Sequence, residues 1–112
     1  DQNMLRIVVS NLLSNAIKYS PEGVTINITS FTSNDQLTIK VEDKGIGIPA
    51  DEQEHLFERF FRARNAVNIE GTGLGLNIVS RYLQHLNGNI TFVSDPDVGT
   101  TFTVSLPMHV KQ

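Results

Sequence analysis

The chain has 112 residues, which is enough for one domain with a buried core and too few for two. Hydrophobic residues make up 39% and charged residues 19%, a balance that excludes wholesale disorder, and no apolar run is long enough to span a bilayer. The absence of cysteine excludes disulfides and thiolate metal sites, and the formal net charge of −3 argues against a nucleic-acid-binding surface.

The first predicted element is a helix over 1–19, where apolar residues recur at three- and four-residue spacing. A proline and a glycine in the next few residues end it. The segments 24–31 and 36–43 alternate and are rich in β-branched residues, and turn-forming residues separate them at 33–35. They predict an antiparallel hairpin.

The middle of the chain, residues 44–75, has no sustained period and is expected to form a functional loop. It contains one short predicted helix around 51–61. The helical period then returns over 74–86, and Gly88 is expected to end this helix in a left-handed conformation after Asn87.

Two more strands are predicted over 89–95 and 100–107, joined by a turn at 96–99. The order helix, two strands, loop, helix, two strands predicts an α+β fold. We expect a two-layer α/β sandwich with a mainly antiparallel, mixed sheet and about three helices on one face. The strand and helix alternation of a doubly wound parallel sheet is absent from this order.

The first helix carries a polar edge in the segment NLLSNAIKYS. At 100° per residue, Asn11, Asn15, Lys18 and Tyr19 fall within about 100° of one another beside the apolar stripe. Such an edge can form the wall of a binding site. The alternative is a solvated border in which these side chains only cap the helix.

Two strand ends carry a polar residue on the core-facing side. Asp43 shares its face with Ile39 and Val41, and Thr100 shares its face with Phe102. A buried carboxylate needs a donor, which the exocyclic amine of adenine can supply. The alternatives are that Asp43 only caps the turn before a glycine, and that Thr100 bonds only to nearby backbone.

Three glycines, at 71, 73 and 75, open the second predicted helix in the segment EGTGLGLNI. Glycine allows backbone amides to approach a phosphate, and a helix N-terminus favours anions. The spacing differs from the dinucleotide-binding fingerprint and from a P-loop. A glycine-rich turn that only shapes a loop is the alternative.

The segments NLLSNAIKYS, DKGIGIP, FERFFR, GTGLGLNIV and GTTFTVSLP occur together, in the order and spacing typical of sensor histidine kinases. Over essentially its whole length, 1–112, the chain resembles the catalytic ATP-binding domain of that family. The family belongs to the gyrase, Hsp90, histidine kinase and MutL superfamily, so the resemblance implies a Bergerat fold. Five ordered motifs make the resemblance specific, whereas each motif alone is weak.

The resemblance implies a role for individual residues. Asn15 is the implied Mg²⁺ ligand and Asn11 supports the metal and the phosphates, while Asp43 and Thr100 recognise adenine, with water commonly joining them to the base. The implied catalytic residues are Asn11, Lys18 and Arg62. The other implied nucleotide-binding positions are Tyr19, Gly45, Gly47, Ile48, Phe57, Phe60, Gly71, Thr72, Gly73, Leu74, Gly75 and Leu76.

Phe57 and Phe60 match the motif that anchors a lid over 63–71, and Arg62 matches an arginine that approaches the γ-phosphate. One amide oxygen together with phosphates is sufficient for Mg²⁺, which prefers oxygen ligands and often keeps waters.

The sequence also indicates which reaction the resemblance favours. Hydrolases of the superfamily carry an acid at the position of Asn11, and an amide cannot act as the general base that activates water. Transfer to a protein is therefore favoured over rapid hydrolysis. An apolar residue follows each of His55, His85 and His109, whereas the acceptor motif has an acid there, so the acceptor histidine is expected on a separate domain.

The resemblance thus implies ATP and Mg²⁺ as ligands, with transfer of the γ-phosphoryl group to a dimerisation domain and a response regulator acting downstream. We expect the chain to be a cytoplasmic, monomeric fragment of a parent that can be membrane-anchored, without nucleic-acid or membrane contacts of its own. One alternative is a fragment of an ATPase clamp or chaperone, which rapid hydrolysis would support. Another is a degenerate domain that serves only protein contacts, which titration with an ATP analogue would distinguish.

Overall fold

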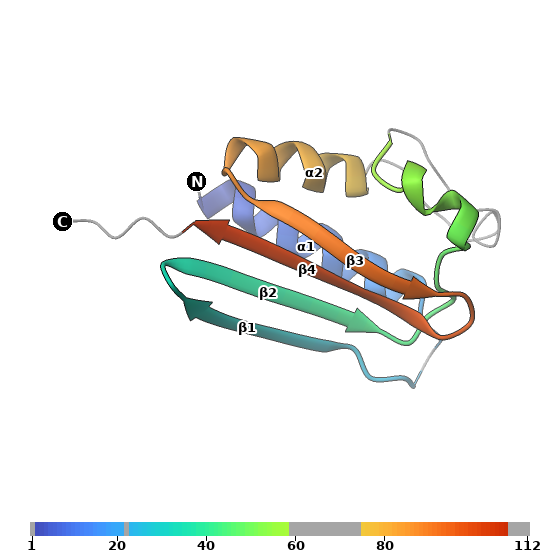
Figure 1. Cartoon of the computed structure of the whole chain (residues 1–112). Coiled ribbons are helices and arrows are strands. Elements are labelled where there is room, and N and C mark those ends of the chain that lie inside the picture. The colour runs from blue at the N-terminus through green and yellow to red at the C-terminus, as the bar shows by residue number, and fades with distance from the viewer. Residues whose placement is uncertain (1, 22, 59–74, 108–112) are drawn as a thin grey trace.

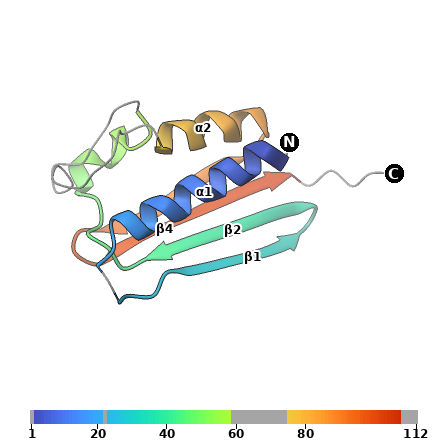
Figure 2. The same cartoon turned by 180° about the vertical axis from the view of Figure 1, so that it is seen from behind.

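The computed structural model describes residues 2–21, 23–58 and 75–107. The elements are α1 (Gln2–Lys18), β1 (Asn27–Ser33), β2 (Gln36–Asp43), the 3₁₀ helix η1 (Ala50–His55), α2 (Gly75–His85), β3 (Asn89–Asp95) and β4 (Gly99–Pro107). The strands form one sheet in the order β1-β2-β4-β3, and every pair of neighbours is antiparallel. Both α-helices cover one face of this sheet (Figures 1 and 2), which confirms the predicted two-layer sandwich. Among the described residues, neither α-helix has the length and hydrophobicity of a membrane-spanning segment.

The strand register separates an apolar face from a polar one. On the helix-covered face, Ile39 of β2 and Ile90 of β3 both lie opposite Val104 of β4. On the other face, Lys40 lies opposite Thr103 and both are at least partly exposed. Because side chains alternate along each strand, this register fixes which polar residues can enter the interior.

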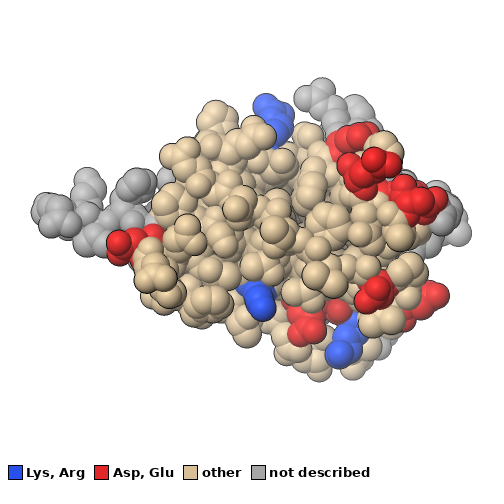
Figure 3. All heavy atoms as spheres, viewed as in Figure 1, with Lys and Arg blue, Asp and Glu red and all other residues tan. Residues whose placement is uncertain are grey.

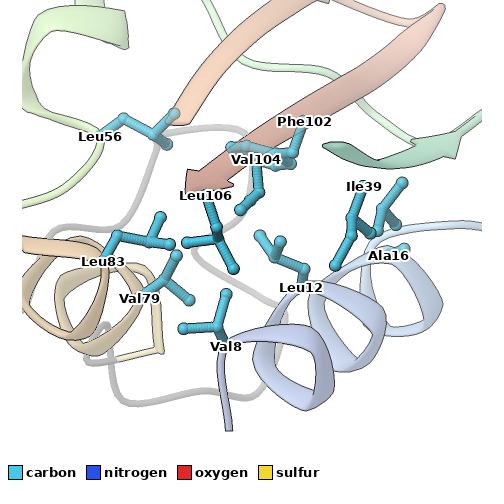
Figure 4. Close-up of a cluster of buried hydrophobic side chains, with 11 residues drawn as sticks. Val8, Leu12, Ala16, Ile39, Leu56, Val79, Leu83, Phe102, Val104 and Leu106 are labelled. Atoms are coloured by element: carbon cyan, nitrogen blue, oxygen red, sulfur yellow. The ribbon is translucent and has the colours of Figure 1, made fainter. Parts of the chain in front are cut away.

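The core lies between the sheet and the two helices (Figure 4). Its buried members are Val8, Leu12, Ala16, Ile39, Val41, Leu56, Val79, Leu83, Phe102, Val104 and Leu106. Full burial of one large aliphatic side chain stabilises a fold by about 1.5–3 kcal/mol. The core therefore holds α1 and α2 firmly against the sheet, and every group on their edges takes its position from this packing.

The predicted hairpin is confirmed, but its first strand begins at Asn27 and not at Val24. Asn34 and Asp35 form the turn, both with positive φ (54° and 63°), the geometry of a two-residue type I′ hairpin. Asn27 pairs with Glu42, almost at the end of β2. Residues before Asn27 have no partner strand, because the chain after β2 turns away towards α1.

α2 ends where the sequence predicts, but the residue that takes the left-handed conformation after it is a different one. Asn87, with a φ of 59°, takes the left-handed conformation that we expected of Gly88. The amide of Gly88 donates to the carbonyl of Leu83 (2.8 Å) and that of Asn87 to Gln84 (3.2 Å), which is the Schellman arrangement. Gly88 is required for a different reason, since a Cβ there would lie 2.6 Å from the carbonyl oxygen of Ser105.

The short helix of the central loop is a 3₁₀ helix, Ala50–His55, and it is shorter than the predicted helix over 51–61, because residues 56–58 are not helical. Its bonds run from Glu52 to the carbonyl of Pro49 (3.0 Å) and continue past its end from Leu56 to Gln53 (3.2 Å). No residue of η1 is buried, so no apolar stripe extends it. The expected helix beyond residue 58 lies outside the described residues.

Candidate functional site

Three buried polar side chains form a row across the sheet at the end where β2 stops. Asp43 on β2 lies opposite Thr100 on β4, and Thr100 lies opposite Ser94 on β3. Their exposed fractions are 9%, 6% and 9%, and within the described ranges they are the only buried polar or charged residues. The prediction that Asp43 and Thr100 face the interior together is confirmed.

Asp43 is held by backbone donors on one side only. Its Oδ1 accepts the amide of Gly45 (2.9 Å) and the amide of Thr100 (3.2 Å), and Oδ2 takes part in neither bond. Burial raises the pKa of the Asp43 carboxyl above its ordinary value, while these two amides oppose the rise. Part of its capacity to accept hydrogen bonds therefore remains for a donor outside the backbone.

The loop after β2 is clamped between α1 and the turn that joins β3 to β4. The amide of Ile46 donates to the carbonyl of Tyr19 (3.1 Å), and the amide of Asp97 donates to the carbonyl of Ile46 (2.7 Å). A Cβ on Gly45 would collide with the carbonyl of Tyr19, and one on Gly47 with the carbonyl of Asp95. The structure thus gives these glycines a role that the sequence did not suggest: each lets the chain approach its own backbone.

We expect Gly47→Ala to lower the free energy of unfolding by at least about 2 kcal/mol, because its positive φ (70°) and the Asp95 carbonyl both oppose a side chain. Gly23→Ala is the matched control. Gly23 also has a positive φ (84°), but a Cβ added there would have no atom within 4 Å, so only backbone strain is expected. Urea denaturation of both variants measures the difference, and equal losses would contradict a packing role for Gly47.

The polar edge of α1 meets the beginning of α2. A Cβ on Gly75, the first residue of α2, would lie 3.5 Å from Oδ1 of Asn11 and 3.8 Å from Oδ1 of Asn15. The unpaired amides at a helix N-terminus attract anions, and amide oxygens are ligands of the type that Mg²⁺ prefers. These groups fit a metal-bound phosphate, and Asn15 is the described side chain that would hold the ion, with Asn11 beside it.

The last turn of α1 connects this region to the row on the sheet. Along the helix, Asn11 and Tyr19 are separated by a rise of about 12 Å. Lys18 is exposed, with its Nζ 6.0 Å from the centre of the Tyr19 ring, and the carbonyl of Tyr19 contacts the loop after β2. One helix edge therefore passes from the start of α2 to the neighbourhood of Asp43.

Charge is unevenly distributed over the face drawn in Figure 3, where acidic side chains gather at the end that carries η1. This helix contributes Asp51, Glu52 and Glu54. An anionic ligand near these carboxylates needs compensating cations. Lys18, in the last turn of α1, and a metal ion held by Asn15 can supply them.

Phe57 anchors the start of the segment that leads into the predicted lid. Its ring packs edge-on against Phe92 with the ring centres 6.0 Å apart, and its carbonyl accepts Nδ2 of Asn77 on α2 (3.1 Å). Ile48 and Leu76 are partly buried and pack against the core. The remaining predicted positions lie outside the described residues: Phe60, Arg62, Gly71, Thr72, Gly73, Leu74 and the lid over 63–71.

Sequence reasoning missed Ser94, Gln53 and Asn77. Ser94 lies on the same face of β3 as Ile90 and Phe92. The alternation of side chains that placed Asp43 in the interior would therefore have placed Ser94 there too. Gln53 donates through Nε2 to the carbonyls of Ile48 (3.0 Å) and Ser94 (3.1 Å), which ties the loop after β2 to β3. No local pattern in the sequence indicates this contact.

Comparison with known proteins agrees with the architecture. The profile of the histidine kinase-, DNA gyrase B- and HSP90-like ATPases matches residues 1–110. The sensor-like histidine kinase SenX3 of Mycolicibacterium smegmatis is 45% identical over 109 residues, which cover 96% of this chain and 28% of SenX3. The chain thus spans little more than a quarter of this relative.

Two solved structures are similar over the same region. The mycobacterial sensor histidine kinase MprB superposes with a TM-score of 0.87 at 34% identity, covering 96% of this chain and 74% of the MprB chain. Full-length ShkA in complex with AMPPNP superposes with a TM-score of 0.80 at 28% identity, covering 96% of this chain and 22% of ShkA. The chain therefore belongs to the histidine kinase-, DNA gyrase B- and HSP90-like ATPase family, as a catalytic ATP-binding domain of the sensor histidine kinase type.

Proposed function

We propose that the chain binds Mg-ATP and donates its γ-phosphoryl group to a histidine on a separate dimerisation domain of its parent protein. The observation that carries this proposal is the buried Asp43 carboxylate, whose Oδ2 is not used by the two backbone amides that hold Oδ1. A buried acceptor beside the Thr100 hydroxyl suits the amino group and N1 of adenine. Full-length ShkA, which contains a domain of this fold, forms a complex with AMPPNP, and this supports nucleotide binding by the chain.

The phosphates would extend along α1 towards Asn15, Asn11 and the first residue of α2. Mg²⁺, when bound, would neutralise charge on the transferring group, and phosphoryl transfer depends chiefly on such neutralisation and on alignment. In the transfer, an imidazole nitrogen bonds to the γ-phosphorus, the bond to the β,γ-bridging oxygen breaks, ADP leaves and the imidazole loses its proton. A downstream response regulator would then receive the phosphoryl group.

The described residues of the chain favour transfer over hydrolysis. Asn11 lies beside Asn15 at the start of α2, where an acid would be needed to activate water, and its amide cannot take that proton. His55 is exposed and paired with Glu58 (2.7 Å between Nδ1 and Oε2), and His85 is exposed at the end of α2. Neither histidine belongs to the buried row of Asp43, Thr100 and Ser94.

The experiment supplies the chain with radiolabelled ATP, Mg²⁺ and the separately purified dimerisation domain of the parent. We expect acid-labile phosphate on that domain, dependent on the chain and abolished when its acceptor histidine is replaced by glutamine. Binding of AMPPNP to the chain alone is measured by calorimetry. Rapid release of inorganic phosphate without transfer would support a hydrolase instead, and failure to bind AMPPNP would refute the proposal.

A further inference from the structure

Ser94 is a buried hydroxyl that belongs to the row of Asp43 and Thr100 and has no role in the function proposed above. Its Oγ lies 2.7 Å from Oγ1 of Thr100 and accepts the amide of Ile48 (2.8 Å). A third neighbour is the carbonyl oxygen of Gly99, 3.4 Å away. Ser94 therefore contacts both the hydroxyl of the candidate base site and the loop that follows Asp43.

The distances around the Ser94 hydroxyl favour one direction for the bond between the two hydroxyls. Only one of the two hydroxyl protons can lie in the 2.7 Å contact. If Thr100 donates, the proton of Ser94 must go to Gly99, and 3.4 Å is long for a hydroxyl hydrogen bond. If Ser94 donates, its proton lies in the short bond, and the hydroxyl proton of Thr100 is free to point towards the site.

Adenine requires the second arrangement. Its Watson–Crick edge carries an amino donor next to the N1 acceptor, and it can be satisfied by an acceptor next to a donor. Asp43 supplies the acceptor on one strand, and Thr100 supplies a donor on the neighbouring strand only when its own proton is free. Guanine and hypoxanthine present a carbonyl and an N1 proton, which would oppose both groups.

We infer that Ser94 is a specificity-determining residue: by donating to Thr100, it makes the Thr100 hydroxyl a direct donor to purine N1. This inference rests on the proposed function, because it assumes that the row of Asp43 and Thr100 holds the adenine base. Ser94 is a positioning residue in this scheme. It acts through Thr100 and does not touch the nucleotide.

The test compares the affinities of ATP and 1-deaza-ATP, in which a C–H group replaces N1, by calorimetry with Mg²⁺. For the unmodified chain we expect ATP to bind at least about tenfold more tightly, the usual scale for leaving a buried donor unpaired. In Ser94→Ala no donor holds the Thr100 proton in the orientation towards the base, so this proton can take other rotamers and the ratio should fall to about threefold or less. A general loosening of the loop at Ile48 would weaken both nucleotides equally and leave the ratio unchanged, so the ratio reports on N1 alone.

A double-mutant cycle identifies the route of the effect. Thr100→Val keeps the backbone amide that binds Asp43 and removes the hydroxyl, so the ratio of the affinities for ATP and 1-deaza-ATP should fall to about one. Adding Ser94→Ala to this variant should then change the ratio no further. Ser94→Thr, which keeps a hydroxyl, should restore the ratio. Thermal unfolding of every variant confirms that it is folded.

Two results would overturn the inference while leaving nucleotide binding intact. One is a ratio that Ser94→Ala leaves unchanged although Thr100→Val abolishes it, which would limit Ser94 to a structural role. The other is equal affinity of the unmodified chain for ATP and 1-deaza-ATP. If the unmodified chain binds neither nucleotide, the proposed function itself fails.

Discussion

Asp43→Asn is expected to weaken the binding of AMPPNP by about 100-fold or more. The asparagine Oδ1 can still accept the amides of Gly45 and Thr100, so the backbone stays in place. Its Nδ2 replaces Oδ2 and turns an acceptor into a donor, which then faces the amino group of adenine. Loss of a hydrogen bond to a charged group costs about 1.5–3 kcal/mol, and an unpaired buried donor adds to this loss. Calorimetry with Mg²⁺ at neutral pH measures the change.

The stability of the same variant provides its folding control. Burial raises the pKa of Asp43, so the folded chain holds this proton more tightly than the unfolded chain. The contribution of Asp43 to the free energy of unfolding is therefore lost as the pH rises from the pKa of Asp43 in the unfolded chain through its pKa in the folded chain. At pH 7 the asparagine variant should be at least as stable as the unmodified chain, and any advantage should shrink as the pH falls to about 3.9.

A neighbouring carboxylate gives a matched comparison for Asp43. Glu42 is exposed and lies on the opposite face of the sheet, next to Asp43 in sequence. Glu42→Gln changes the net charge by the same amount and should leave the affinity for AMPPNP within about twofold. Undiminished affinity in a folded Asp43→Asn variant would remove the adenine role of this carboxylate.

Asn15→Ala is expected to reduce phosphoryl transfer to the dimerisation domain by at least about 100-fold. The side chain that is removed carries one of the two amide oxygens beside the first residue of α2. Without it, Mg²⁺ loses its protein ligand, and alignment and charge neutralisation of the phosphates suffer together. Initial rates of transfer at saturating ATP measure this loss.

The metal dependence of binding distinguishes this effect from loss of adenine recognition. We expect Asn15→Ala to bind AMPPNP with nearly the same affinity in Mg²⁺ and in EDTA, whereas Asp43→Asn should keep the difference between the two. Ser14→Ala is the control, because Ser14 is the exposed neighbour of Asn15 on α1. An Asn15→Ala variant that still shows the full Mg²⁺ effect would show that the ion is held elsewhere.

Features that depend on local periodicity could be predicted from the sequence alone. The apolar stripe of α1 identified the edge that carries Asn11 and Asn15, and strand parity placed Asp43 and Thr100 on the core side before their strands were known to be neighbours. Such patterns are set by the geometry of a single helix or strand, so they can be read without knowledge of the partner. Five ordered motifs then indicated the family.

The contacts between these elements, in contrast, follow from the three-dimensional packing of the chain. The bond from the Thr100 amide to Asp43 joins residues 57 positions apart, and the bond from the Ile48 amide to Ser94 joins residues 46 apart. The left-handed residue at the end of α2 is Asn87, and Gly88 is required instead because a side chain there would collide with β4. The requirement for glycine at 47 likewise comes from the backbone of β3. Contacts of this kind depend on which strands become neighbours and how closely the chain packs against itself, and no local pattern encodes either.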